Sequence, residues 1–471
     1  MAATSQPISY DVQKAIFKHM DVNRRLAIAQ RCPALRAAER GTPLHIDFLD
    51  LQPYGFQINM TRYNFGILRI IKEKKEKNEF IDEMNSEGGA QYEMDVYGVK
   101  DCGGEDVKYP GDIAIPEDER ERELVLENLC LRELVDMKNE LYRAQRESLE
   151  LRRRPPRQRI PFPGVQESDE DHSDSEDTFS SDEEEEEDFE REFEKIETYL
   201  APYYYRRQKI RPPYDFYIQF KNGMEGVERL VYGDQAKMHR AVHEFAERTF
   251  GGRRSPIVVR LLNVCTYGAV LRLSEGFKLR VQQLRYGDNF EKMAHVLEAI
   301  LDKSSFPLKD VSCGVTYKNA MLSTAEQLLI DTRKTPKHGW LNFLLHVKNR
   351  KVLMISNAVR APDFVKLVED WMRHGKPVGT CFCFASTDNA LSRDVYYAMR
   401  QHRKSTETKV LTARSRMFPN CFTFPMSKST ELNVYGDVFT QRPYEENLNE
   451  CYWQLKIEVC PIGFAEQLKQ E

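Results

Sequence analysis

From residue 202 to about residue 464, short apolar runs alternate with longer runs of helical periodicity. Segments such as 257–264 and 327–331 are largely apolar, as expected of strands buried on both faces of a sheet. Segments such as 290–301 and 362–372 carry apolar residues at helical spacing instead. Strands that are joined through helices predict parallel βαβ units, so this region is expected to form an α/β domain.

The predicted elements of this domain follow one another regularly. Strands are predicted at 214–220, 257–264, 279–284, 311–315, 327–331, 352–355 and 381–384, and from residues 420, 431 and 452. Helices are predicted at 236–250, 290–301, 340–347 and 362–372. Strands recur about every 25–30 residues, a spacing that favours an irregular, open solenoid of the leucine-rich-repeat type. We place the domain at residues 201–466.

The start of the chain has a different pattern. Residues 1–42 predict a short helical unit, in which Ser9 or Asp11 caps the first helix and Asp21 or Asn23 caps the second. A unit of this size has too little core to be stable alone. We therefore expect it to dock on a neighbouring part of the chain or on a partner.

Two further segments precede the linker. Residues 43–115 alternate apolar and polar side chains, and we expect this strand-rich segment to pack with the C-terminal domain. Within it, 72–87 is predicted as a charged loop and 92–99 as a strand. Residues 116–151 predict one long amphipathic helix. The fold class is therefore α+β or mixed.

Residues 152–200 are predicted to be a disordered linker, basic at first and then acidic. Five arginines fall within residues 152–159, which suits nuclear entry or contact with nucleic acid. Residues 165–197 hold 18 acidic and two basic side chains, so they carry −16 while the whole chain carries −5. The rest of the chain therefore carries +11. Such a block is either a solvated spacer or an arm that binds a basic surface.

Four serines in the acidic tract have an acidic residue three positions later, the context that acidophilic kinases favour. These candidate phosphorylation sites are Ser168, Ser173, Ser180 and Ser181.

No pattern in the chain indicates catalysis. We find no phosphate-binding glycine loop, no dinucleotide fingerprint and no nucleophile elbow. His239 and His243 share a helix face and Cys381 and Cys383 share a strand face, but packing roles are favoured for all four. We therefore expect a chain that is not an enzyme, with no cofactor, no metal site and no catalytic residue.

The first segment begins with a proline and an aliphatic residue, carries apolar positions on two helices and a Met-Asp junction, and ends in a Cys followed by a basic turn. In these features it resembles an F-box, a helical motif that binds Skp-type adaptors. The resemblance implies adaptor-binding roles for Pro7, Ile8, Val12, Ile16, Met20, Leu26, Ala29 and Leu35. The chain departs from the motif at Gln6 and lacks its usual tryptophan.

Six further short segments carry a second resemblance, namely Pro43-Leu44, Tyr63–Ile67, Asp95–Gly98, Pro110–Ile113, Gly375–Phe382 and Phe424–Lys428. In these segments the remainder of the chain is similar to a nematode-expanded family of F-box proteins with a largely uncharacterised associated domain. The resemblance implies a substrate-recognition adaptor for an SCF-type cullin-RING ubiquitin ligase, whose partners are a Skp-type adaptor, the cullin complex and an unknown protein substrate. The alternative is an interaction module with a degenerate F-box and no ligase role.

The expected location is the cytoplasm, the nucleus or both. The first residues have no basic and then apolar pattern of a secretory signal, and no apolar run reaches the about 18 residues of a membrane span. Ten cysteines are too few for a disulfide scaffold in a chain of 471 residues. A membrane partner is not expected, and nucleic acid is less favoured than protein.

Overall fold

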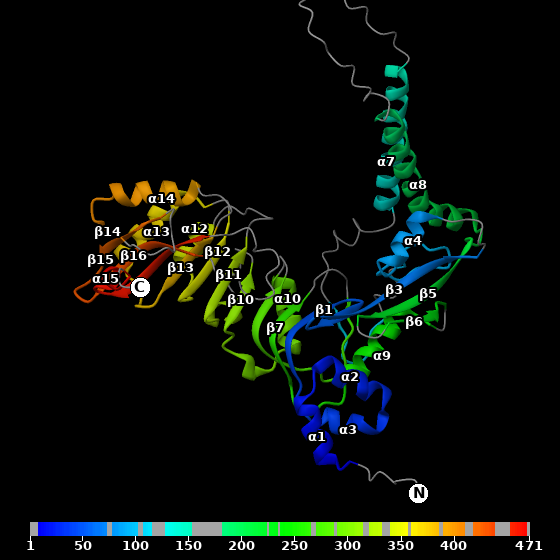
Figure 1. Cartoon of the computed structure of the whole chain (residues 1–471), viewed down its shortest axis with the longest axis horizontal. Helices are drawn as coiled ribbons and strands as arrows, with labels where there is room; N and C mark the ends of the chain where they lie inside the picture. The colour runs from blue at the N-terminus through cyan, green and yellow to red at the C-terminus, as the bar shows by residue number, and fades with distance from the viewer. Residues whose placement is uncertain are drawn as a thin grey trace, which may run out of the picture. The chain divides into compact units, whose positions relative to one another are not determined.

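The computed structural model divides the chain into two compact units (Figure 1). The larger unit comprises Met1–Arg62, Tyr109–Ile115 and Phe245–Glu471, and the smaller unit comprises Tyr63–Lys108 and Pro116–Glu244. The units interleave along the chain, so they do not coincide with the predicted boundaries. The structure describes residues 8–72, 78–101, 107–114, 128–152, 181–223, 226–233, 236–264, 270–286, 290–313, 320–331, 340–356, 359–385, 390–409, 418–438 and 453–468.

Short helices form the start of the larger unit. They are α1 (Tyr10–His19), α2 (Val22–Arg31), the 3₁₀ turn η1 (Pro33–Leu35) and α3 (Arg36–Arg40). The Ser9 hydroxyl accepts a hydrogen bond from the Val12 amide, and the Asp21 carboxylate accepts from two amides at the start of α2. These caps satisfy amides that have no partner within the helix, and they confirm the predicted starts of both helices.

Parallel strands form the centre of the larger unit. The strands β7, β9, β10, β11, β12 and β13 lie side by side in chain order, and β1 pairs with β7. The bounds are β1 (His45–Gln52), β7 (Ile257–Val264), β9 (Leu279–Tyr286), β10 (Asp310–Cys313), β11 (Gln327–Asp331), β12 (Lys351–Ile355) and β13 (Cys381–Ala385). From β9 onward each connection contains a helix, as predicted for βαβ units. These helices are α10 (Phe290–Ile300), α11 (Ala320–Thr324), α12 (Trp340–His346) and α13 (Ala361–His374), and the 3₁₀ turn η2 (Lys303–Ser305) follows α10.

The strand pairing changes from parallel to antiparallel at β13. Beyond it the order is β17, β16, β15 and β14, and every neighbouring pair from β13 onward is antiparallel. The bounds are β14 (Thr406–Lys409), β15 (Asn420–Pro425), β16 (Thr430–Val438) and β17 (Trp453–Pro461). Two helices, α14 (Ala390–Gln401) and α15 (Phe464–Gln467), complete this part. The repeating βα pattern therefore ends at β13.

Two small pairings complete the larger unit. The strand β2 (Gly55–Ile58) forms a hairpin with β1, and β4 (Ile113–Ala114) pairs with β8 (Val270–Leu271). Beside β4, Asp112 and Arg272 form a buried ion pair at 2.6 Å. The adjacent Gly111 has φ +94°, and an added Cβ would lie 2.4 Å from the Ser274 backbone. The motif Pro110–Ile113 thus fixes a close backbone approach that only glycine allows.

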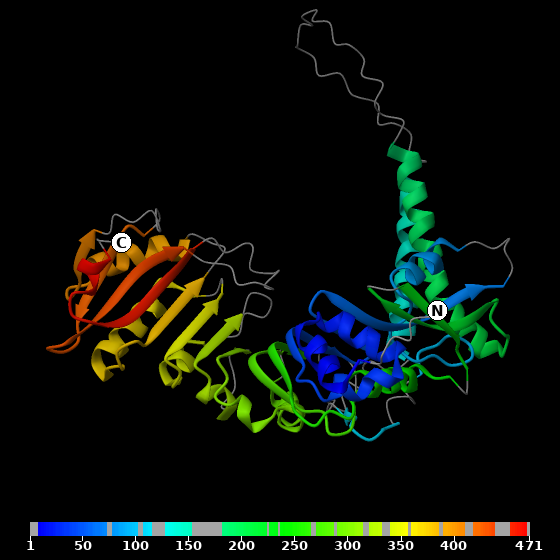
Figure 2. The same ribbon diagram turned by 60° about the horizontal axis from the view of Figure 1, so that its bottom comes forward.

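One face of the sheet packs on helices (Figure 2). Trp371 and Phe364 of α13 lie with their ring centroids 4.8 Å from Phe382 and 5.2 Å from Phe384, respectively. All four side chains are at most 1% exposed. Because successive strand residues point to opposite faces, Cys381 and Cys383 lie on the other face of β13.

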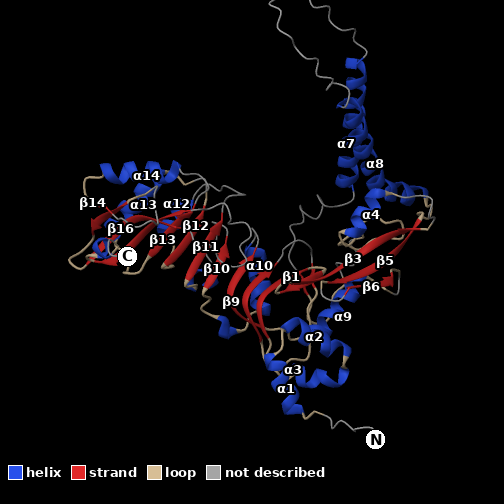
Figure 3. Cartoon of the chain, viewed as in Figure 1, coloured by secondary structure: helices blue, strands red, loops and turns tan. Residues whose placement is uncertain are grey.

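The smaller unit combines an antiparallel sheet with long helices (Figure 3). Its strands are β3 (Thr61–Ile71), β5 (Tyr214–Asn222) and β6 (Gly226–Val231), paired in that order. Its helices are α4 (Glu79–Ser86), α7 (Asn128–Arg152), α8 (Ser181–Gln208) and α9 (Met238–Phe250), and the last turns of α9 belong to the larger unit. The helices α7 and α8 lie side by side, and Lys138 of α7 bonds Glu197 of α8 at 2.8 Å.

The predicted disordered linker needs correction. Residues 181–200 belong to α8, and Ile196 and Leu200 are at most 2% exposed. Glutamate is a good helix former, and Phe189, Phe193, Ile196 and Leu200 recur every three or four residues, so a helix can form despite the charge. Residues 153–180 lie outside the described part, as does the stretch 116–127 of the predicted long helix.

Two smaller predictions are also wrong. The predicted loop 72–87 contains α4, which Asn78 caps and which buries Phe80 and Ile81. The predicted strand 92–99 is a turn, because the Asp95 carboxylate accepts hydrogen bonds from the Tyr97 and Val99 amides.

At the level of fold class the prediction is confirmed, since the chain is a mixed α/β protein with a large mixed sheet. None of the helices in the described part of the chain combines the length and the apolar composition that crossing a bilayer requires.

Candidate partner-binding surfaces

The first candidate surface is a row of apolar side chains on and just before α1. Ile8, Val12 and Ile16 follow at four-residue spacing and are 55%, 50% and 45% exposed. Tyr10 beside them is 50% exposed. Residues spaced by four lie on one face of a helix, so this row is continuous. We call Ile8, Val12 and Ile16 the α1 row.

The opposite side of α1 and the inner side of α2 form the core of the helical unit. Phe17, Leu26 and Ala29 are at most 7% exposed, whereas Met20 and Leu35 are half-buried. Pro7 lies outside the described residues. The predicted adaptor-binding set therefore divides into the exposed α1 row and packing residues. Leu26 and Ala29 lie in the interior of this unit.

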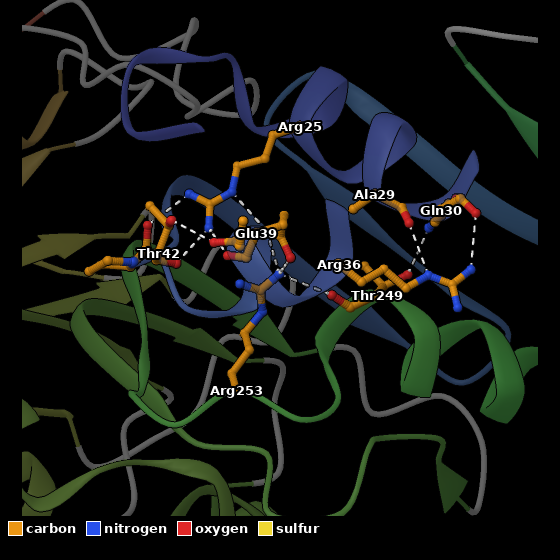
Figure 4. A network of polar contacts seen from close by, with 10 residues as sticks. Arg25, Ala29, Gln30, Arg36, Glu39, Thr42, Thr249 and Arg253 are labelled. Atoms are coloured by element: carbon orange, nitrogen blue, oxygen red, sulfur yellow. Dashed lines mark hydrogen bonds and ion pairs between the residues drawn. The ribbon is translucent and has the colours of Figure 1, made fainter. Parts of the chain in front are cut away.

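A buried ionic network fixes α2 to α3 (Figure 4). Arg25 Nε donates to Glu39 Oε1 at 2.8 Å, and its Nη1 and Nη2 donate to the backbone carbonyls of Pro43, Glu39 and Thr42. Arg253, in the loop after α9, donates through Nη2 to both carboxylate oxygens of Glu39 at 2.7 and 2.8 Å. The three side chains are at most 5% exposed. This network ties the α1–α3 unit to the loop at residues 251–256.

The charges of this network do not balance. Two guanidinium groups share the single carboxylate of Glu39. Burial lowers the pKa of Arg25, the Glu39 charge opposes that shift, and the like charge of Arg253 adds to it. Both arginines stay protonated, so the buried group of Arg25, Arg253 and Glu39 carries one excess positive charge.

Further hydrogen bonds support the same junction. The Arg36 side chain donates to the carbonyls of Ala29 and Gln30, and the Gln30 amide donates to the Thr249 hydroxyl of α9 at 3.2 Å. These hydrogen bonds and the Glu39 network hold in place the helical unit that carries the α1 row.

The second candidate surface lies on the sheet face opposite α13. Cys381 and Cys383 of β13 point to this face, with their sulfurs 3.8 Å apart. Across the strand pair, Lys456 lies opposite Cys383 and Glu458 lies opposite Cys381. Lys456 Nζ bonds Asp437 of β16 at 2.5 Å, and the Tyr435 hydroxyl donates to Glu458 at 2.6 Å. We call Cys381, Cys383, Tyr435, Asp437, Lys456 and Glu458 the thiol face.

The two thiols of this face differ in acidity. The hydrogen bond with Cys381 lowers the pKa of Cys383, although burial opposes the shift, and the Lys456 ammonium lowers it further. The same pairing, with burial, raises the pKa of Cys381. The ion pair with Asp437 raises the pKa of Lys456 against the effect of burial. Cys383 is therefore the more reactive thiol, because the thiolate is the nucleophile.

A buried apolar cluster continues this face along the parallel strands. Leu329, Leu353, Ile355 and Ala385 form the cluster, and Cys383 packs against it. The paired registers place Leu329, Leu353 and Cys383 in one row across β11, β12 and β13. The four clustered side chains are at most 7% exposed, so they belong to the core, and the polar groups of the thiol face lie at its antiparallel end.

The two predicted histidines do not form a metal site with each other. His239 is buried, and its Nδ1 lies 2.8 Å from Glu93 Oε1, while its amide donates to the same oxygen. The Tyr232 hydroxyl donates to Glu93 Oε2 at 2.6 Å. Hydrogen bonds from His239 and Tyr232 lower the pKa of Glu93 despite its burial. The favoured packing role of His239 is therefore confirmed. In the described stretches, no three His, Cys, Asp or Glu side chains are grouped so as to hold a metal ion.

Three of the candidate phosphorylation sites, Ser168, Ser173 and Ser180, lie outside the described residues. Ser181 is the first residue of α8.

Sequence reasoning missed Glu39 and Arg253 because the two residues are 214 positions apart. It also missed the thiol face beyond its cysteines. The alternation Gln454, Lys456, Glu458 within an apolar strand is the signal that could have identified a polar sheet face.

Comparison with known proteins gives one family match. Residues 237–388 match a family described as a domain of unknown function (DUF3557). The matched region runs from α9 to just past β13 and covers less than half of the chain. No curated protein and no solved structure matches the chain.

Proposed function

We propose that the protein is a non-catalytic, F-box-like substrate-recognition adaptor of an SCF-type ubiquitin ligase. The observation that carries the proposal is the exposed α1 row on a small helical unit whose sequence resembles an F-box. A Skp-type adaptor would cover Ile8, Val12 and Ile16, as an apolar groove covers one face of an amphipathic helix.

The free energy expected from covering the α1 row suits such an interface. Full burial of a large aliphatic side chain contributes about 1.5–3 kcal/mol. Because each residue of the α1 row is about half exposed, covering the rest would contribute about 1 kcal/mol per residue. The caps at Ser9 and Asp21 and the Glu39 network order the unit beforehand. Little additional ordering is therefore needed on binding.

The larger unit would supply the substrate surface. Its parallel strands β7 to β13 lie side by side in chain order, and we infer that they form an irregular α/β solenoid whose face opposite the helices binds protein. The half-buried polar side chains of the thiol face, Asp437, Lys456 and Glu458, would provide specificity. The protein would act by proximity, since it raises the concentration of a substrate near a ubiquitin-loaded enzyme.

Co-purification of the full chain with a Skp-type adaptor tests the proposal. The variant Ile8→Asp/Ile16→Asp places two charges in the α1 row and is expected to abolish co-purification. Met60→Asp is the matched control, because Met60 is an 81% exposed apolar residue of the same unit outside α1. Circular dichroism should be unchanged for all three proteins, since no core side chain is altered.

Two results would contradict the proposal. One is adaptor retained by the double variant as well as by the wild-type chain. The other is no adaptor with any of the three folded proteins, which would favour the alternative of an interaction module with a degenerate F-box and no ligase role.

A further inference from the structure

A cavity lies in the larger unit next to the Glu39 network. The loop after α9 at residues 251–256 and the stretch 275–278 before β9 line a volume of about 270 Å³. Phe250 and Phe277 form an apolar wall, with their ring centroids 5.3 Å apart. Arg253 lies between this cavity and Glu39.

Arg253 has unused hydrogen-bonding capacity. Its side chain is 5% exposed, and its Nη2 group is occupied by Glu39. Its Nε and Nη1 atoms are buried and have no hydrogen-bond partner. A buried donor without a partner loses the free energy of its hydration, and a charged one loses more. Because these two atoms are closed off from solvent, a molecule in the cavity meets the charge of Arg253 and not these N–H groups.

The charges around the cavity favour an anion. Its lining holds three cations, Arg253, Arg254 and Lys278, against two carboxylates, Glu275 and Asp302. Asp302 already accepts from the amide and hydroxyl of Ser304, and these hydrogen bonds lower its pKa. The other two members of the network, Arg25 and Glu39, carry opposite charges and therefore add no net charge. The lining therefore keeps one uncompensated positive charge.

We propose that this cavity, which we call the Arg253 cavity, binds a small phosphate monoester. A phosphate group carries about −1.5 to −2 charges and three strong acceptor oxygens, which match the positive charges of Arg253, Arg254 and Lys278. Ser255 adds a hydroxyl to the lining. The volume exceeds what a single phosphate group needs, and the Phe250 and Phe277 wall suits the organic part of the ester.

Isothermal titration of the full chain with glycerol 2-phosphate tests the inference, with glycerol and acetate as comparison ligands at one ionic strength. We expect saturable one-to-one binding of glycerol 2-phosphate, no binding of glycerol, and at least ten-fold weaker binding of acetate. Equal affinity for acetate would show that the cavity binds a simple carboxylate as well as a phosphate ester, and would overturn the proposed ligand class.

Variants locate the site. Arg254→Gln and Lys278→Gln each remove an exposed cation of the lining. Each is expected to weaken binding at least ten-fold. Arg260→Gln, which changes a surface cation on β7 outside the lining, should leave the affinity within two-fold. No saturable binding to the wild-type chain, or equal affinity in folded Arg254→Gln and Arg260→Gln, would refute the inference.

Discussion

Replacing Glu39 by glutamine tests whether the buried network holds the helical unit in place. Glu39 is 3% exposed and is the only carboxylate in the described network, so its neutralisation leaves Arg25 and Arg253 without a counter-charge. Removing one partner of a buried pair costs about 3–5 kcal/mol. Because the glutamine oxygen still accepts one hydrogen bond, we expect a value of about 3 kcal/mol, the lower end of that range.

Hydrogen exchange of the amides in α2 and α3 measures this loss directly. A change of about 3 kcal/mol corresponds to roughly a hundred-fold faster exchange through local opening, at about 1.4 kcal/mol per ten-fold. Arg260→Gln is the control, because the Arg260–Asp47 pair is longer, at 3.4 Å, and partly exposed. Such a surface pair contributes about 0–1 kcal/mol. Equal exchange rates in the two variants would refute the reasoning.

Three further predictions concern other parts of the chain. Trp371→Ala should lower the free energy of unfolding in urea by about 3–5 kcal/mol, because the side chain is fully buried, and a loss under about 1 kcal/mol would contradict this packing. Glu93→Gln should cost more stability at pH 7 than at pH 3. The pKa of Glu93 is lowered below its ordinary 4.5, so its contribution is present above that value and is lost as pH falls through the folded pKa; an equal difference at both pH values would exclude this. Iodoacetamide should modify Cys383 before Cys381, and Lys456→Met should slow that reaction; mass spectrometry showing Cys381 modified first would reverse the assignment.

The parallel part of the fold follows closely from local pattern. The predicted strands at 257–264 and 327–331 agree with β7 and β11 residue for residue, and α13 extends the predicted 362–372 by one or two residues at each end. Strands buried on both faces and amphipathic helices have strong, distinct apolar patterns. The adjacent α14 was missed, although its buried face is equally regular.

For residues 181–200, the helical spacing of the apolar residues agrees with the structure better than the acidic composition does. The acidic content of 181–200 outweighed the apolar spacing of α8 in the prediction, yet Leu200 is fully buried. The strand predicted at 92–99 failed for a different reason, because one aspartate side chain, Asp95, replaced strand pairing by a local turn.

The candidate surfaces were predictable in part. The α1 row follows from helical spacing and from the F-box resemblance, because both depend on nearby residues. The partner of Glu39 could not be predicted, since Arg253 reaches it only through the tertiary fold. The same holds for Lys456 beside Cys383, which depends on β17 inserting between β13 and β16.

The Glu39 network and the Arg253 cavity should be energetically linked. In Glu39→Gln the excess positive charge next to the cavity rises by one, and the Nη2 group of Arg253 loses its ionic partner. An anion in the cavity would then compensate a larger unfavourable charge, so glycerol 2-phosphate should bind this variant more tightly than the wild-type chain. By linkage, the ester should restore more stability to Glu39→Gln than it adds to the wild type, measured as the shift in thermal midpoint at fixed ionic strength. Equal shifts for the two proteins would show that the cavity and the network act independently.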